Sequence, residues 1–121
     1  MKISPRLALA TMIVALAGAA NAHPRLNVAS PAPNAVLTSS PGEIRIAFSE
    51  GLIARFSGLE VADQAGRKAG LGSASVSPSN NRQLVAAVRA PLAPGAYVVS
   101  WHVVGDDTHH VSGRYSFQVK R

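Results

Sequence analysis

The sequence has no cysteine, and this absence limits the chemistry open to the protein. Without thiols it can form neither a disulfide nor a thiolate metal site, so a small exported domain must be held together by burial alone. The only methionines, Met1 and Met12, lie near the start of the chain. The soft sulfur ligands that Cu(I) prefers are therefore missing from everything after residue 12.

Long hydrophobic runs and clusters of like charge are also missing. The longest apolar run, residues 7–17, is well short of the roughly 20 residues needed to cross a bilayer. Basic residues outnumber acidic ones by 12 to 6, but they are scattered, and aromatic residues make up only 5% of the chain. No basic run or aromatic platform is present, so we expect no nucleic-acid partner.

The first 22 residues have the three parts of a secretory signal peptide. Lys2 and Arg6 give a basic start, residues 7–17 are apolar, and the small-residue box Ala20-Asn21-Ala22 provides a cleavage site. We expect cleavage after Ala22 and one remaining domain, residues 23–121, which is long enough for a single core. This exported domain is expected to be soluble and monomeric.

From residue 26 onward, apolar and polar residues alternate in short runs, which is typical of antiparallel strands with one wet face. Turns containing Pro, Gly or Asn, such as 78–81, separate the runs, and residues 50–56 could contain a helical turn. About seven short strands predict an all-β Greek-key barrel or an immunoglobulin-like sandwich. The expected strands cover residues 26–29, 43–48, 59–62, 74–76, 83–88, 97–103 and 115–119.

The densest polar cluster, residues 105–110, lies between two of these strands. Residues two apart in an extended chain point to the same side, so Asp107 and His109 can converge while His110 faces away. His23 would become the first residue after cleavage, and its free amine and imidazole could chelate a metal together. The alternative is a hydrophilic hairpin loop and a first residue without a role.

Cu(II) is the ion that suits these donors best. The amine and imidazole of His23, with Asp107 and His109, would form an N,N,N,O set, which fits tetragonal Cu(II). Pro24 has no backbone N–H, so a site built from deprotonated amides is excluded and a terminal-histidine chelate, a histidine brace, remains. Zn(II) and Ni(II) should bind more weakly.

These features resemble the copper-resistance protein C (CopC) family of periplasmic copper-binding proteins. The resemblance extends over residues 23–121. Its motifs occur in the family's order: His23-Pro24, Ser30-Pro31-Ala32-Pro33, Phe48-Ser49-Glu50-Gly51-Leu52, Phe56-Ser57-Gly58, Leu92, Pro94-Gly95-Ala96-Tyr97, Val99-Ser100-Trp101, Asp107-Thr108-His109, Gly113 and Phe117.

The resemblance implies a cupredoxin-like Greek-key barrel that binds one Cu(II) per chain through His23, Asp107 and His109. Glu50 matches a family glutamate beside that site, either as a weak ligand or as a hydrogen-bonding neighbour of the ligands. The alternative for Glu50 is an ordinary surface carboxylate at a strand end.

Two departures from the family pattern bear on function. Many members carry a methionine-rich Cu(I)-binding loop, whereas residues 62–76 contain neither Met nor His, so a Cu(II)-only protein is expected. His110 stands where the family often has proline, and is either a surface residue or an extra ligand or proton relay. His102 alternates with the apolar stripe of its strand and is expected to be structural, on the outer sheet face.

The resemblance implies a non-enzymatic role in copper homeostasis or resistance in the periplasm. The protein would act as a detached module that sequesters Cu(II) or passes it to an inner-membrane CopD-type protein. One alternative is a copper-dependent oxidative enzyme, which needs an open coordination position and a broad substrate face. Another is a metal-free adhesion or assembly sandwich with incidental histidines.

Overall fold

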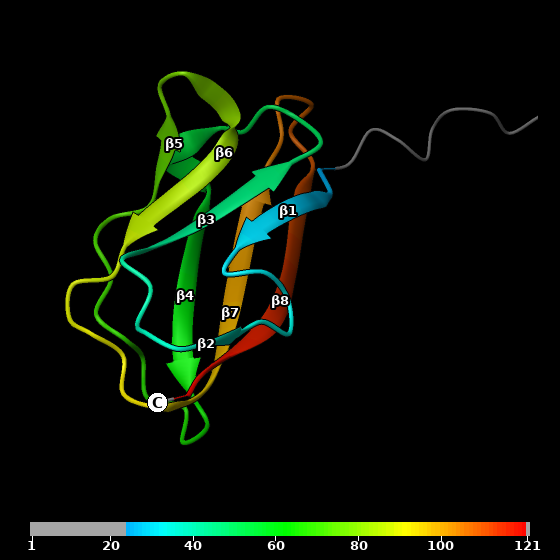
Figure 1. Ribbon diagram of the computed structural model, residues 1–121. Helices are drawn as coiled ribbons and strands as arrows, with labels where there is room; N and C mark the ends of the chain where they lie inside the picture. Colours follow the sequence, from blue (N-terminus) through cyan, green and yellow to red (C-terminus); the bar gives the residue numbers. More distant parts are fainter. Residues whose placement is uncertain (1–23, 121) are drawn as a thin grey trace, which may run out of the picture.

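The computed structural model describes residues 24–120, which form two four-stranded sheets packed as a β-sandwich (Figure 1). One sheet has the order β1-β3-β6-β5 and the other the order β2-β8-β7-β4. The predicted all-β sandwich is confirmed. The strands are β1 (Leu26–Ser30), β2 (Val36–Leu37), β3 (Glu43–Phe48), β4 (Gly58–Asp63), β5 (Ser75–Ser77), β6 (Asn80–Ala87), β7 (Gly95–Val104) and β8 (His110–Val119).

The core lies between the sheets and is made of the alternating apolar residues. On β3 the inward residues Ile44, Ile46 and Phe48 are almost completely buried, and β7 and β8 contribute matching stripes. Each such side chain stabilises the fold by about 1.5–3 kcal/mol on burial. Because the sheets have one wet face each, the alternation in the sequence shows directly which residues face the core.

The strand bounds differ from the expectation in places where short-range pattern is weak. The two-residue strand β2 pairs in parallel with β8, Val36 with Gln118, and is too short to give any periodicity. The turn predicted over residues 78–81 was too long, because Asn80 and Asn81 already belong to β6. The ambiguous run 50–56 does contain a helical turn, the 3₁₀ helix η2 (Ala54–Phe56).

Two aromatic side chains fix the β7–β8 hairpin to the rest of the sandwich. Tyr97, near the start of β7, donates a hydrogen bond from its hydroxyl to the carbonyl oxygen of Ala93 at 2.6 Å, as in the tyrosine corners of Greek-key sandwiches. Trp101 packs edge-on against Phe48, with ring centroids 4.9 Å apart, and covers Gly113 on β8.

Within residues 24–120, no helix is long and apolar enough to span a bilayer.

Candidate metal centre

Three segments that are far apart in the sequence meet at one end of the sandwich: the start of β1, the end of β3 and the β7–β8 turn (Figure 1). The backbone N–H of Ser49, just after β3, donates to the carbonyl oxygen of Arg25 at 2.8 Å. Leu52 forms an isolated antiparallel β-bridge with Gly105, and the N–H of Asp106 donates to the carbonyl oxygen of Gly51 at 3.0 Å. Backbone hydrogen bonds therefore hold all three segments together.

The β7–β8 turn has a defined shape. The N–H of Gly105 donates to the carbonyl oxygen of His109 at 3.1 Å, and the N–H of Thr108 donates to that of Gly105 at 2.8 Å. Thr108 adopts a positive φ of 69°, which reverses the chain between Asp107 and His109. The turn brings the side chains of residues 107 and 109 to the same side.

Asp107 and His109 are in direct contact. Nδ1 of His109 and Oδ2 of Asp107 are 2.7 Å apart, and the backbone N–H of His109 donates to Oδ1 of Asp107 at 3.1 Å. The hydrogen bond from the His109 ring, followed by that from its backbone, lowers the pKa of Asp107 below its ordinary value of 3.8. Asp107 therefore presents an ionised carboxylate at neutral pH.

This pair has the separation and exposure that a metal site requires. Nitrogen and oxygen ligands lie about 2.0–2.2 Å from a divalent ion such as zinc, so two adjacent donors at right angles lie about 3 Å apart. The side chains of His109 and Asp107 are 51% and 33% exposed, which leaves them accessible from solvent. The expected convergence of the two side chains is present, and their role as ligands stays a prediction.

His23, the third expected ligand, lies outside the described residues, but its neighbour Pro24 has a clear place. The Pro24 side chain is fully buried. A Cβ atom on Gly105 would lie 2.8 Å from Cγ of Pro24 and 2.9 Å from Oδ1 of Asp107. The Pro24 ring and the Asp107 carboxylate thus both lie against Gly105, so the chain enters the described domain beside the Asp107–His109 pair.

Glu50 lies at the same end of the sandwich. It is half-buried and directly precedes Gly51, whose carbonyl oxygen accepts from the backbone of Asp106. Within residues 24–120, the Glu50 carboxylate makes no hydrogen bond or ion pair. Its predicted role as a weak ligand or as a neighbour of the ligands is compatible with this placement and stays a prediction.

Sequence reasoning missed Asn81, which also reaches this end. Its carbonyl oxygen accepts from the N–H of Leu52 at 2.9 Å, and its side-chain amide lies against Gly51 together with the carboxylate of Asp106. Asn81 stands at the start of β6, where only the pairing of β6 with β3 brings it close. No motif or spacing in the sequence signals this contact.

His102 and His110 lie on the outer face of the β7–β8 hairpin. His110 begins β8 opposite Val104, on the outer face, and is exposed. His102 is exposed on the same face, with its imidazole against Gly58. Among residues 24–120, no three His, Asp or Glu side chains gather closely enough to hold a metal ion.

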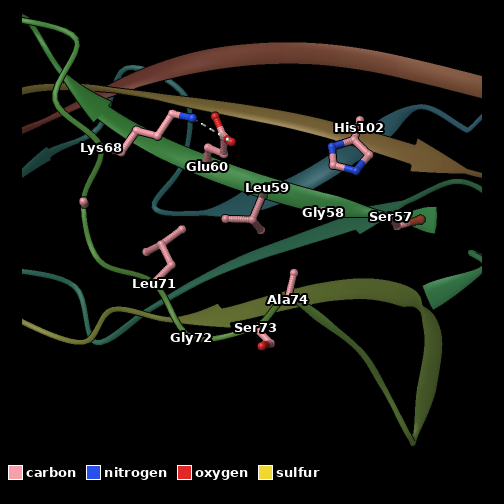
Figure 2. A pocket seen from close by; sticks show the side chains of 11 residues that line it. Ser57, Gly58, Leu59, Glu60, Lys68, Leu71, Gly72, Ser73, Ala74 and His102 are labelled. Atoms are coloured by element: carbon pink, nitrogen blue, oxygen red, sulfur yellow. Dashed lines mark hydrogen bonds and ion pairs between the residues drawn. The ribbon is translucent and has the colours of Figure 1, made fainter. Parts of the chain in front are cut away.

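An open groove of about 400 Å³ lies elsewhere, between β4 and residues 68–74 (Figure 2). His102 stands at one end of it, and an ion pair between Lys68 and Glu60, 3.2 Å apart, crosses the other. Leu59, Leu71 and Ala74 form its apolar part. With one imidazole and a carboxylate already paired to an ammonium, this groove is a poorer metal site than the hairpin turn.

Comparison with known proteins identifies a family and several relatives. The CopC domain family matches residues 26–120. Copper resistance protein C of Xanthomonas campestris pv. juglandis is 36% identical over 124 residues, which cover 93% of this chain and 95% of that protein.

Two solved structures have the same fold and about 30% identity. The crystal structure of CopC from Methylosinus trichosporium OB3b superimposes with a TM-score of 0.76 and is 30% identical, covering 81% of this chain and 94% of that one. PcoC, a methionine-rich copper resistance protein from Escherichia coli, gives a TM-score of 0.72 and 30% identity, covering 82% and 100%. Unlike a methionine-rich protein, the present chain has no methionine after Met12.

Proposed function

The chain belongs to the CopC domain family, and on that premise we propose that it binds one Cu(II) ion in the periplasm, through His23, Asp107 and His109. The family and its relatives support a copper-binding role in copper resistance. The ligand set, the oxidation state of copper and the compartment are the parts that we propose.

The observation that carries the proposal is the meeting of Pro24 and Asp107 at Gly105. Asp107 and His109 offer two donor atoms 2.7 Å apart, and the buried Pro24 ring lies against the same glycine. The residue before Pro24 is His23, and cleavage after Ala22 would make it the first residue of the domain 23–121. Its amine and imidazole would then complete an N,N,N,O set.

The chemistry of this set favours Cu(II). Three nitrogens and one carboxylate oxygen suit a tetragonal ion, and Pro24 has no N–H that a competing amide-bound site would require. The thioether and thiolate ligands that hold Cu(I) are missing from residues 23–121. Before cleavage, the nitrogen of His23 is part of a peptide bond, so the full site forms only in the processed chain.

Glu50 is proposed as a neighbour of this site rather than one of its three main ligands. Its half-buried carboxylate follows β3 at the same end of the sandwich. A carboxylate in this position can orient a ligand imidazole by accepting its second N–H, or bind the ion weakly.

We propose that the protein carries or buffers copper and does not catalyse a reaction. Its relatives are named as copper resistance proteins. In such a protein, copper would be the ion that is bound and carried rather than a catalytic cofactor. A CopD-type inner-membrane protein is the proposed recipient or donor. The protein is proposed to act as a monomer.

The test compares the chain that begins at His23 with one that carries a single additional glycine before it. Cu(II) is titrated against a competing chelator, with quenching of the only tryptophan, Trp101, and the electron paramagnetic resonance (EPR) spectrum as readouts. The extension should lower the affinity and change the Cu(II) spectrum, because it converts the amine into an amide. His102→Ala is the matched control and should change neither.

If the extended and the processed chains bind Cu(II) with the same affinity and spectrum, the terminal-histidine site is wrong. Turnover of oxygen or peroxide by the copper-loaded processed chain, lost in His23→Ala, would overturn the non-catalytic role. Failure of the processed chain to bind Cu(II) tightly would favour a metal-free assembly module.

A further inference from the structure

We propose that Ser49 is a positioning residue, which holds the beginning of the processed chain in place so that His23 meets Asp107 and His109. This inference rests on the proposed function. Ser49 acts through the backbone of Arg25, which lies two residues after His23 in the sequence.

Ser49 binds Arg25 at two points. The backbone N–H of Arg25 donates to Oγ of Ser49 at 2.9 Å, and the N–H of Ser49 donates to the carbonyl oxygen of Arg25 at 2.8 Å. These bonds extend the β1–β3 pairing one residue beyond Leu26 and Phe48. In a regular antiparallel pair a backbone carbonyl would accept from Arg25, whereas here a hydroxyl does, so the contact depends on the side chain.

This contact adds to two other restraints on the segment that begins at Pro24. The ring of Pro24 fixes its own φ, and burial against Gly105 holds the ring in place. A residue that precedes proline is restricted to extended conformations, which limits ψ of His23. With the N–H of Arg25 held by Ser49, Pro24 and Arg25 are both held in place at this end of the sandwich.

Such restriction strengthens metal binding because less conformational freedom is lost when the ion binds. In Ser49→Ala the N–H of Arg25 loses its acceptor, and the terminal segment can move away from the turn. Loss of one hydrogen bond of ordinary strength corresponds to an increase of about three- to tenfold in the Cu(II) dissociation constant. We expect the increase to come mainly from faster dissociation. Ser49→Thr keeps the hydroxyl and should restore the affinity.

The test is a double-mutant cycle with four proteins: the native sequence and Ser49→Ala, each beginning at His23 or carrying one glycine before it. Ser49→Ala should weaken Cu(II) binding in the processed chain and leave the residual binding of the extended chain unchanged. The EPR spectrum of the processed Ser49→Ala protein should shift toward that of the extended chain, which a change in stability alone would not produce.

Ser40→Ala is the matched control. Oγ of Ser40 also accepts a long-range backbone hydrogen bond, from the N–H of Leu92 at 2.7 Å, but at the opposite end of the sandwich, before β3 begins. It should lower the melting temperature to a similar extent as Ser49→Ala and leave the Cu(II) affinity of the processed chain unchanged.

Two outcomes overturn the inference while leaving the copper site intact. One is an unchanged Cu(II) affinity in Ser49→Ala when the glycine extension does weaken binding. The other is an equal loss of affinity in the processed and extended chains, which would mean that Ser49 acts on the fold as a whole. If the extension itself has no effect, the proposed site fails, whatever Ser49 does.

Discussion

Replacement of Tyr115 by phenylalanine should stabilise the protein, because the tyrosine hydroxyl is buried without a partner. Tyr115 faces the core on β8 and is 9% exposed. Its hydroxyl oxygen has no hydrogen-bond partner among residues 24–120. Phenylalanine keeps the ring and its packing and removes only the unsatisfied group.

The expected gain follows from the desolvation of that hydroxyl. A buried polar group without a partner costs about 1–3 kcal/mol relative to one that is satisfied. We use the lower end of this range, because small shifts of the Tyr115 ring can reduce the penalty. The expected gain in the free energy of unfolding is about 1 kcal/mol at pH 7. For a domain of this size, that gain corresponds to a rise in melting temperature of about 4–8 °C.

Alkaline pH should enlarge the difference between the two proteins. Burial raises the pKa of Tyr115 to about 12 from its ordinary value of 10.0. Between these two values only the unfolded chain loses the phenolic proton, so the free energy of unfolding falls as pH rises. The loss approaches about 2.7 kcal/mol across the whole window, and the phenylalanine variant avoids it.

The assay is urea unfolding of the metal-free protein at pH 7 and at several values between pH 9 and 11.5, followed by Trp101 fluorescence. Tyr97→Phe is the matched control, because the hydroxyl of Tyr97 donates to the carbonyl oxygen of Ala93 at 2.6 Å. It should destabilise the protein by about 1 kcal/mol. If Tyr115→Phe is the less stable protein at pH 7, its hydroxyl has a partner such as a bound water, and the reasoning is refuted.

Four further predictions concern the site and the core. Asp107→Asn should raise the Cu(II) dissociation constant at least tenfold in a chelator competition, since even residues that only orient metal ligands have effects of that size; unchanged affinity would remove Asp107 from the ligand set. Acid should release Cu(II), because protons compete with the ion for its nitrogen donors, whereas hydrogen bonds from His109 hold the pKa of the Asp107 carboxyl below its ordinary value. The release midpoint, followed by EPR, should therefore move to higher pH in Asp107→Asn, and an unmoved midpoint would contradict this. Gly113→Ala should destabilise the protein by about 1–3 kcal/mol in urea unfolding, because the new Cβ would overlap the Trp101 ring. His110→Ala should leave the Cu(II) affinity and spectrum unchanged, as expected for a side chain on the outer face, and a change would make it part of the site.

Much of the fold follows from short-range pattern. The bounds of β3 coincide with the predicted run 43–48, because its alternation is regular and its inward residues are all large. β7 and β8 extend beyond the predicted runs. The two strands of a hairpin go on pairing through residues that do not alternate between apolar and polar, so the alternation does not mark where the strands end. β2 escaped prediction, because a two-residue strand depends on its partner β8 rather than on its own composition.

The candidate site was predictable only in part. Asp107 and His109 stand two residues apart, so their convergence follows from local geometry, and the turn around Thr108 strengthens it. The leader and the place of His23 at its end are predictions from the sequence alone. Glu50 was placed near the site by the family resemblance, and no spacing in the sequence indicates it.

The sequence by itself determined an all-β domain that has no sulfur ligands after residue 12, and it predicted export and a metal site built from histidine and aspartate. Only the tertiary structure decided that Pro24 lies against Gly105 beside the turn and that Arg25 is bound to Ser49. The reason is physical. Side-chain type and alternation act within a few residues, whereas these contacts join positions 24 and 81 residues apart, which only the pairing of strands brings together.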